Sequence, residues 1–180
     1  SLSGLLLAPR LKLDSADLLE AALATASGNL LGIGLGIWSE ASTANALGMV
    51  SLVGLASTGL GIGAAKLTEY SHTDKVLVGY GTLYGAFLGQ QAPKLWVQND
   101  ANKLSKHQGA GILWGLGTGS LAAAFAAQYI EYTPKDLGET ALGTVASSAL
   151  GLGLGMMLSA DPRLATGMMS GVGLLGTTLS

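Results

Sequence analysis

The chain has 180 residues, of which 11% are charged and 49% are apolar, and its formal net charge is −2. An ordinary soluble domain has about 25% charged residues, so this chain has too little charge to solvate the whole surface of a compact monomer. The low charge and the lack of a Lys/Arg cluster argue against a nucleic-acid partner, whose phosphates require a concentrated basic surface. The absence of cysteine excludes disulfide bonds, thiolate metal ligands and thiol nucleophiles.

Local capping chemistry predicts helix starts throughout the chain. SADLLEAAL (15–23) and SHTDKVL (71–77) each place an acidic residue in the first turn after a Ser or Thr cap. TPKD (133–136) and DPRL (161–164) each combine a cap with proline at the first helical position. Weaker starts near Ser42 and Ser105 complete six helices, which begin at roughly 15, 42, 73, 105, 133 and 161.

Two segments admit a different interpretation. LLGIGLGI (30–37) and VLVGYGTLYG (76–85) alternate in the manner of outer-membrane strands. The helix caps, the alanine-rich stretches and the scarcity of aromatic residues favour helices instead. The prediction is an all-α chain, and a β-barrel is the alternative.

The helices repeat as three hairpins. Aligning Asp17, Asp74 and Asp136 brings DLLEAALATASGNLLG, DKVLVGYGTLYGAFLG and DLGETALGTVASSALG into register without a gap. The second helices align in the same way, from the starting residues Gly48, Gly111 and Gly167. The predicted fold is therefore an array of antiparallel glycine-rich helical hairpins, with about three copies of a unit of roughly 60 residues.

This repeat divides the chain into four parts. Residues 1–13 match the end of a preceding repeat helix, 14–73 form hairpin repeat 1, 74–135 form repeat 2 and 136–180 form a truncated repeat 3. We expect either a section of a longer array or two half-helices that complement each other. The hairpin connection of repeat 2, at 90–107, is longer than those of the other copies.

Small residues recur four apart on the first helix of each hairpin, although glycine costs about 1 kcal/mol relative to alanine inside a helix. Residues four apart lie on one helix face, so a stripe without side chains lets a neighbouring backbone approach closely. We predict that the helices pack through these stripes. The predicted packing positions are Gly28, Gly32, Gly81, Gly85, Gly89, Gly111, Gly115, Gly119, Gly143 and Gly151.

Long uncharged stretches predict membrane-spanning helices, because a hydrocarbon core requires about 20 helical residues. Nearly all charge falls in the connections between these stretches. We expect a lipid bilayer as the partner, together with self-association or neighbouring repeats of a longer chain. The alternative is a soluble α-solenoid that binds protein partners or itself. The uncharged windows are 21–39, 41–65, 76–93, 108–130, 141–160 and 165–180.

No set of residues supports catalysis, a metal site or a cofactor. His72 and His107 are expected in solvated connections, with no further His or Cys to complete a metal set. The glycine-rich stretches GIGLGIW and GLGTGSL are expected within helices, whereas a dinucleotide-binding loop follows a strand and opens a helix. We therefore predict no enzyme activity and no cofactor.

Two polar positions recur in all three copies. The first is an aspartate of the first turn, expected to cap its helix rather than bind a cation: Asp17, Asp74 and Asp136. The second is a threonine midway along the helix, expected to bond the carbonyl four residues earlier, with a polar seam along a conduit as the alternative: Thr25, Thr82 and Thr144.

At SGNLLGIGLG, YGTLYGAFLG and GILWGLGTG the chain resembles glycine-rich helical-hairpin repeats of large, functionally uncharacterised proteins of predatory and social bacteria. The resemblance implies a repeat region in a large envelope-associated polypeptide, and it carries over no site residue. The expected function is a non-enzymatic structural or assembly module in the membrane of a bacterial envelope. Its expected forms are an oligomeric ring, a pore or a scaffold that encloses lipid.

Overall fold

The computed structural model describes residues 15–65, 68, 70–97, 100–158 and 161–178. These residues form six α-helices and a short 3₁₀ helix, with no strand among them, which confirms the all-α prediction. The predicted half-helix at 1–13 lies outside the described residues. The elements are α2 (Ser15–Trp38), α3 (Thr43–Ala65), α4 (His72–Gln91), η1 (Ala92–Leu95), α5 (Ala101–Ala126), α6 (Pro134–Leu158) and α7 (Pro162–Thr178).

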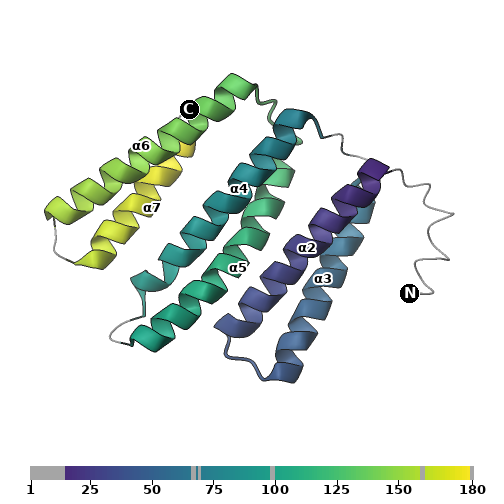
Figure 1. Ribbon diagram of the computed structural model, residues 1–180, viewed down its shortest axis with the longest axis horizontal. Helices are drawn as coiled ribbons and strands as arrows, with labels where there is room; N and C mark the ends of the chain where they lie inside the picture. The colour runs from purple at the N-terminus through teal and green to yellow at the C-terminus, as the bar shows by residue number, and fades with distance from the viewer. Residues whose placement is uncertain (1–14, 66–67, 69, 98–99, 159–160, 179–180) are drawn as a thin grey trace.

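Consecutive helices pair as three antiparallel hairpins, which lie side by side (Figure 1). We call them hairpin 1 (α2 and α3), hairpin 2 (α4 and α5) and hairpin 3 (α6 and α7). Hairpins 1 and 2 pack extensively through α2 and α5. Hairpin 3 contacts hairpin 2 at fewer positions, through α7 with α4 and η1 and through a hydrogen bond from Tyr80 of α4 to Thr144 of α6. Helices α3 and α6 lie at the two outer edges of the array (Figure 1).

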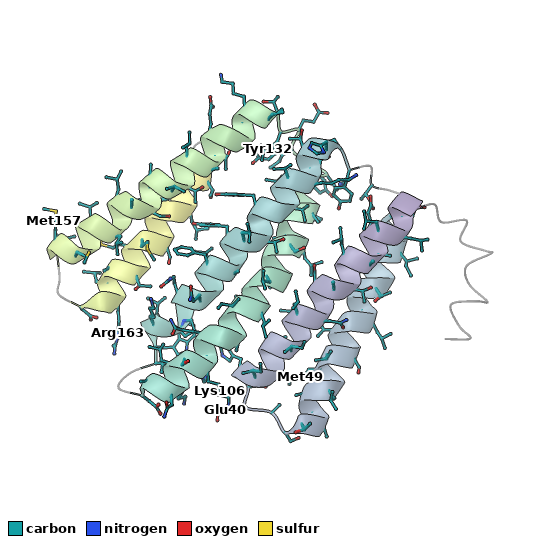
Figure 2. The ribbon with its side chains drawn as sticks, viewed as in Figure 1. Glu40, Met49, Lys106, Tyr132, Met157 and Arg163 are labelled. Atoms are coloured by element: carbon teal, nitrogen blue, oxygen red, sulfur yellow. The ribbon has the colours of Figure 1, made fainter. Side chains whose placement is uncertain are left out.

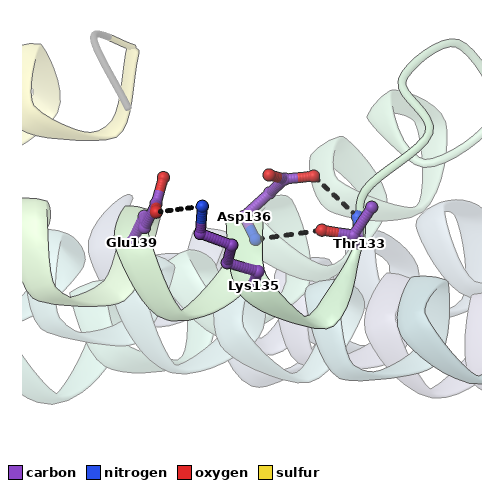
Figure 3. Close-up of polar contacts among 4 residues, drawn as sticks. All are labelled: Thr133, Lys135, Asp136 and Glu139. Atoms are coloured by element: carbon purple, nitrogen blue, oxygen red, sulfur yellow. Dashed lines mark hydrogen bonds and ion pairs between the residues drawn. The ribbon is translucent and has the colours of Figure 1, made fainter.

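Reciprocal capping begins two of these helices. At α4, the Ser71 hydroxyl accepts the Asp74 N–H at 3.2 Å, and the Asp74 carboxylate accepts the Ser71 N–H at 2.7 Å. At α6, Thr133 and Asp136 exchange the same two bonds at 3.3 and 2.8 Å (Figure 3). Each pair satisfies two backbone donors that have no partner inside the helix. The capping role predicted for Asp74 and Asp136 is confirmed.

The start of α5 was predicted too late. The helix begins four residues before Ser105, and the Asp100 carboxylate caps it by accepting the Lys103 N–H at 2.8 Å. His107, predicted in a solvated connection, lies inside α5 and is buried. Most of the predicted connection at 90–107 is in fact helical. The reason is that the first turns of α5 are charged, so the uncharged window begins well inside the helix.

Side chains are sorted by size, in the opposite way to a soluble domain. The buried apolar side chains of the described residues are six alanines and Leu77, besides the fully buried Pro93. Large apolar side chains instead project from the outer helix faces, as Figure 2 illustrates. Soluble domains bury most of their Leu, Val, Phe and Met. Among the outward side chains, exposed fractions run from 68% to 84% at Leu52, Leu83, Phe125, Leu142 and Met157.

Four helices, α2, α3, α5 and α6, are long and apolar enough to cross a membrane. Helix α4 is not among them, although the window 76–93 was expected to be long enough. Helix α7 is not among them either, and its window, 165–180, is the shortest of the six. Helix α7 has 17 described residues, which span about 26 Å, whereas a hydrocarbon core is about 30 Å thick. In α4, Tyr80, Tyr84 and the terminal glutamines reduce the apolar character.

Candidate site: contacts between small residues of neighbouring helices

Helices α4 and α5 touch main chain to main chain through glycine. A Cβ added to Gly85 would overlap the carbonyl oxygen of Gly115, and a Cβ added to Gly115 would overlap that of Gly85. Gly89 and Gly111 have the same reciprocal relation. At the third level, a Cβ on Gly119 would overlap the Gly81 carbonyl oxygen, and one on Gly81 would overlap the Ala123 methyl group. Backbone atoms therefore occupy the space that larger residues would need.

The predicted glycines of α2 contact larger partners. A Cβ on Gly28 would overlap the Ser57 side chain and lie 2.9 Å from the Val53 carbonyl oxygen. A Cβ on Gly32 would lie 2.7 Å from the Val50 Cα. Helices α2 and α3 thus approach each other closely at both Gly28 and Gly32, but at each of these contacts only α2 contributes a glycine.

The predicted glycines of α6 lie at its contact with α7. A Cβ on Gly151 would overlap the Met168 carbonyl oxygen and lie 2.9 Å from the Val172 Cβ. The carbonyl oxygen of Gly143 lies 2.6 Å from the Cβ position of Gly176. All ten predicted packing positions therefore lie where two helices of one hairpin meet.

A second set of glycines, which the stripe reasoning missed, lies between hairpins 1 and 2. A Cβ on Gly34 would lie 2.6 Å from the Trp114 backbone nitrogen, and one on Gly117 would lie 2.9 Å from the Leu31 backbone nitrogen. Positions two apart differ by about 200° around a helix. Gly32 and Gly34 therefore serve opposite faces of α2, which accounts for the alternation that resembles a strand.

Other glycines have open surroundings. No atom outside their own helix backbone lies within 4 Å of the Cβ position at Gly48, Gly59, Gly63, Gly79, Gly109, Gly138, Gly153 and Gly171. Gly48 and Gly111 occupy equivalent places in the sequence repeat, yet Gly111 is buried against Gly89 and Gly48 is exposed. The alignment of the second helices therefore does not correspond to a shared set of contacts.

Backbone conformation does not explain the glycine content. No described glycine has a positive φ, and the only such non-glycine residue in the described chain is Glu40, with φ of 53°. Glycine is the usual residue for positive φ. The described glycines are helical and do not need this conformational freedom. Their lack of a side chain matters instead, because it leaves space for a neighbouring helix.

The recurring threonines bond locally, as predicted. Their hydroxyls donate to the carbonyl four residues earlier: Thr25 to Ala21 at 2.7 Å, Thr82 to Val78 at 2.6 Å and Thr144 to Thr140 at 2.7 Å. Two of the hydroxyls also reach a neighbouring helix. Thr25 lies 2.7 Å from the Thr58 hydroxyl, and Thr144 lies 2.6 Å from the Tyr80 hydroxyl.

Aromatic residues gather where the end of α2 meets hairpin 2. The ring of Trp38 lies 5.2 Å from that of Trp96, 5.8 Å from His107 and 6.2 Å from Trp114, measured between centroids. His107 Nδ1 is 2.9 Å from the Lys103 carbonyl oxygen. The histidine is thus held by packing and a local hydrogen bond. Among the described residues, no group of three His, Cys, Asp or Glu side chains is placed to hold a metal ion.

A polar recess of about 350 Å³ opens beside the start of α4. The Ser71 hydroxyl and the Asp74 carboxylate, which line it, are engaged with each other's backbone in the helix cap. Nearby, the Tyr70 hydroxyl donates to the Ala124 carbonyl oxygen at 3.1 Å. Burial raises the pKa of the Tyr70 phenol, and the negative charge of Glu20 raises it further. The recess is lined by Ser71, Asp74, Ala127, Gln128, Glu131 and Tyr132.

The chain matches no family model, no curated protein and no solved structure. The arrangement of its own residues is therefore the basis for proposing a function.

Proposed function

We propose that the chain is a non-enzymatic structural or assembly module embedded in a membrane, with its hairpins held together by contacts between small residues. The observation that carries the proposal is the sorting by size. Large apolar side chains such as Leu52 and Leu142 face outward, whereas the buried apolar side chains are almost all alanine and the close contacts between helices described above have a glycine on at least one side.

A lipid environment accounts for both halves of this arrangement. Lipid tails are as apolar as leucine, so outward Leu and Met side chains cost nothing there. For the same reason, burying such side chains between helices gains little in a membrane. Helix association then depends on van der Waals contact and on hydrogen bonds between helices. The glycine contacts of α4 with α5 and the buried bond from Ser27 to Ser120, at 2.9 Å, are contacts of these two kinds.

The distribution of charge supports the same proposal. In the described chain, every charged side chain lies in a connection or within two turns of a helix end. Aromatic side chains that favour membrane interfaces are also found near the two ends of the array. Tyr70, Tyr129 and Tyr132 lie near one end, and Trp38 and Trp96 near the other.

Helices α4 and α7 favour the competing candidate, a soluble α-solenoid that covers its outer faces with protein partners or copies of itself. Neither helix is among those suited to span a membrane alone. In a membrane, each would depend on the more apolar helix of its own hairpin. The α4–α5 glycine contact supplies such a dependence for α4.

The envelope of a bacterium is the proposed location, supported by the resemblance of the glycine-rich stretches to repeats of envelope-associated proteins. The proposed form is an oligomeric ring, a pore or a scaffold around lipid. The bilayer and further hairpins, from copies or from a longer chain, are the proposed partners.

Alkaline carbonate extraction of membranes from producing cells tests the proposal. We expect the chain to remain with the membranes, and recovery in the aqueous fraction would refute the membrane proposal. Leu52→Arg should reduce the membrane fraction, because a charge at the centre of a spanning helix costs about 2.5–3.5 kcal/mol. Leu18→Arg, near the end of α2, is the matched control and should have little effect. In a soluble solenoid, Leu52→Arg would instead leave the chain in solution.

A further inference from the structure

We propose that hairpin 3 is a hinged arm, which swings away from hairpin 2 as one unit and is held in its docked position by the hydroxyl group of Tyr80. The joint between hairpins 2 and 3 differs from the joint between hairpins 1 and 2 in the kind of atoms that meet there. Because both joints lie within one chain, the motion does not depend on the membrane proposed above.

Hairpins 1 and 2 meet through backbone atoms. The Cβ position of Gly34 in α2 lies 2.6 Å from the Trp114 backbone nitrogen, and that of Gly117 in α5 lies 2.9 Å from the Leu31 backbone nitrogen. The Ser27 and Ser120 hydroxyls bond each other in the same contact. A gap of about 0.5–1 Å forfeits a quarter to a half of the attraction in each van der Waals contact. Close backbone contact therefore makes this joint stiff.

Hairpin 3 meets hairpin 2 and η1 through the ends of long side chains. At Gly173 of α7, the nearest atom of hairpin 2 to the Cβ position is the Tyr84 hydroxyl oxygen, at 2.8 Å. At Gly167 of α7, the nearest atom is Cδ2 of Leu95 in η1, at 3.6 Å. Side chains change rotamer, so they can follow a small displacement of the helix that they touch. This joint therefore has a freedom that the first joint lacks.

A tyrosine takes the place of a serine in the second joint. The repeat relates α2 to α4 by 57 residues, so Tyr84 stands where α2 has Ser27. The Tyr80 ring, one turn earlier, lies 6.0 Å from the Tyr84 ring, and the two planes are within 6° of parallel. Both hydroxyls reach hairpin 3. The two tyrosines thus form a spacer between α4 and hairpin 3.

The Tyr80 hydroxyl holds the docked position. It donates to the Thr144 hydroxyl at 2.6 Å, and Thr144 in turn donates to the Thr140 carbonyl oxygen at 2.7 Å. Thr140 and Thr144 are both buried, and a polar group that loses its partner in apolar surroundings is destabilised. Hydrogen bonds between membrane helices average about 0.6 kcal/mol, which changes an equilibrium only about threefold. The bond therefore favours docking without making it permanent.

The pivot lies in the connection from α5 to α6. The Ile130 N–H still bonds back to the Ala126 carbonyl oxygen, at 3.1 Å, and Thr133 already belongs to the cap of α6. Glu131 and Tyr132 lie between these two fixed points and line the recess of about 350 Å³. Hinges are a few connecting residues that absorb changes in φ and ψ. The recess leaves room for such changes at Glu131 and Tyr132.

Hairpin 3 has internal contacts that let it move as one unit. A Cβ on Gly151 of α6 would overlap the Met168 carbonyl oxygen of α7, and a Cβ on Gly155 would lie 3.0 Å from the Ala165 backbone nitrogen. These backbone contacts join α6 to α7, and rotation about the connection leaves them intact. Met157 lies at the end of α6 far from that connection (Figure 2). The motion therefore displaces Met157 the farthest.

Distances between pairs of spin labels measure the motion, because a chain without cysteine accepts labels at chosen positions alone. One pair joins Leu83 of α4 to Met157, far from the pivot, and a second joins Leu83 to Leu142, nearer to it. These side chains are 71%, 84% and 73% exposed, so labels should fit without disturbing the packing. We expect a broad distribution with docked and undocked distances for Leu83 with Met157, and a narrower one for Leu83 with Leu142.

Two further pairs are the controls. Leu52 with Leu83 reports on hairpin 1 relative to hairpin 2, across the stiff joint. Leu142 with Leu164 reports on the distance between α6 and α7 within hairpin 3. We expect narrow distributions for both pairs, because backbone contacts fix both distances.

Tyr80→Phe removes the bond that holds hairpin 3 and should raise the ratio of undocked to docked distances between Leu83 and Met157 about threefold. Thr144→Val removes the same bond and should have a similar effect. The double variant should add little, because the two substitutions act on one interaction. Tyr129→Phe, at an exposed tyrosine, should leave the ratio unchanged.

Three results would overturn the inference. They are a narrow distribution between Leu83 and Met157 in every variant, equal broadening between Leu52 and Leu83, and broadening within hairpin 3 that indicates unfolding instead of a swing. The labels are measured in detergent if the chain resists carbonate extraction and in buffer if it does not. A soluble chain with a mobile hairpin 3 would refute the membrane proposal and retain the hinge, and a membrane-bound chain with a fixed hairpin 3 would do the reverse.

Discussion

Gly85 and Gly115 occupy each other's side-chain space: the carbonyl oxygen of each lies where the Cβ of the other would be. No rotamer change can relieve a methyl group added to either residue, since the obstacle is backbone. Gly85→Ala should therefore separate α4 from α5, and we expect it to lower the free energy of unfolding by about 1–3 kcal/mol. Denaturant unfolding in detergent, followed by circular dichroism, measures this change.

Gly79→Ala is the matched control for that substitution. Gly79 lies in the same helix with nothing within 4 Å, so alanine should raise the free energy of unfolding by up to about 1 kcal/mol through helix propensity. Gly85→Leu should likewise cost far more than Leu83→Ala, because the Leu83 side chain is exposed. A similar loss for Gly79→Ala and Gly85→Ala would refute the steric explanation of the glycines.

Glu40, in the connection from α2 to α3, is strained by its φ of 53°. A left-handed conformation costs a non-glycine residue about 1–2 kcal/mol. Glycine avoids this cost, but its larger loss of conformational entropy on folding lowers stability by about 0.5–1 kcal/mol. Glu40→Gly should therefore raise the free energy of unfolding by about 0.5–1 kcal/mol. Glu40→Ala retains the strain and should not stabilise the protein. A gain from alanine equal to that from glycine would point to the charge instead of the backbone.

The bond between the Ser27 and Ser120 hydroxyls, at 2.9 Å, is buried between hairpins 1 and 2. Hydrogen bonds between membrane helices contribute about 0.6 kcal/mol on average in double-mutant cycles. We expect a coupling energy of that size from Ser27→Ala, Ser120→Ala and the double variant. A coupling near zero would indicate that the two hydroxyls do not depend on each other for the packing of α2 on α5.

The Tyr80 hydroxyl bonds the Thr144 hydroxyl at 2.6 Å and so ties α4 to α6. Because hairpin 3 has few other contacts with hairpin 2, Tyr80→Phe should loosen it. We expect faster amide hydrogen exchange in α6 and α7 and unchanged exchange in α2 and α3. Tyr129→Phe, at a tyrosine with 74% of its surface exposed, is the control. Uniform acceleration over all helices would show that the bond supports the whole array.

Local chemistry made much of the fold predictable from the sequence. The caps at Ser71 and Thr133 act within four residues, so their patterns alone predict where α4 and α6 begin. The same holds for the hydrogen bonds of Thr25, Thr82 and Thr144, which depend only on the preceding turn. Asp100 is the exception. Its cap is also local, but the first turns of α5 that follow it are charged. The uncharged window therefore begins after the true start of the helix.

Contacts between hairpins were less predictable, because they depend on residues far apart in the chain. Spacing by four indicates a face but not its partner. It therefore pointed to Gly85 and missed Gly34 and Gly117, which lie two positions from the stripe. It also did not separate Gly111, which is buried, from Gly48, which is open, although both occupy the same place in the repeat. Only the relative rotation of the helices distinguishes them.

If the chain spans a bilayer as proposed, the pairing of unequal helices in hairpins 2 and 3 has a consequence for the order in which its helices insert during synthesis. In hairpin 3 the more apolar helix, α6, leaves the ribosome before α7 and would be in place to receive it. In hairpin 2 the order is reversed, so α4 must wait for α5 before both can cross together. Delaying translation after α4 has left the ribosome but before α5 has left it should therefore trap the nascent chain with α4 still on the membrane surface. A similar pause after α6 has left the ribosome but before α7 has left it should not.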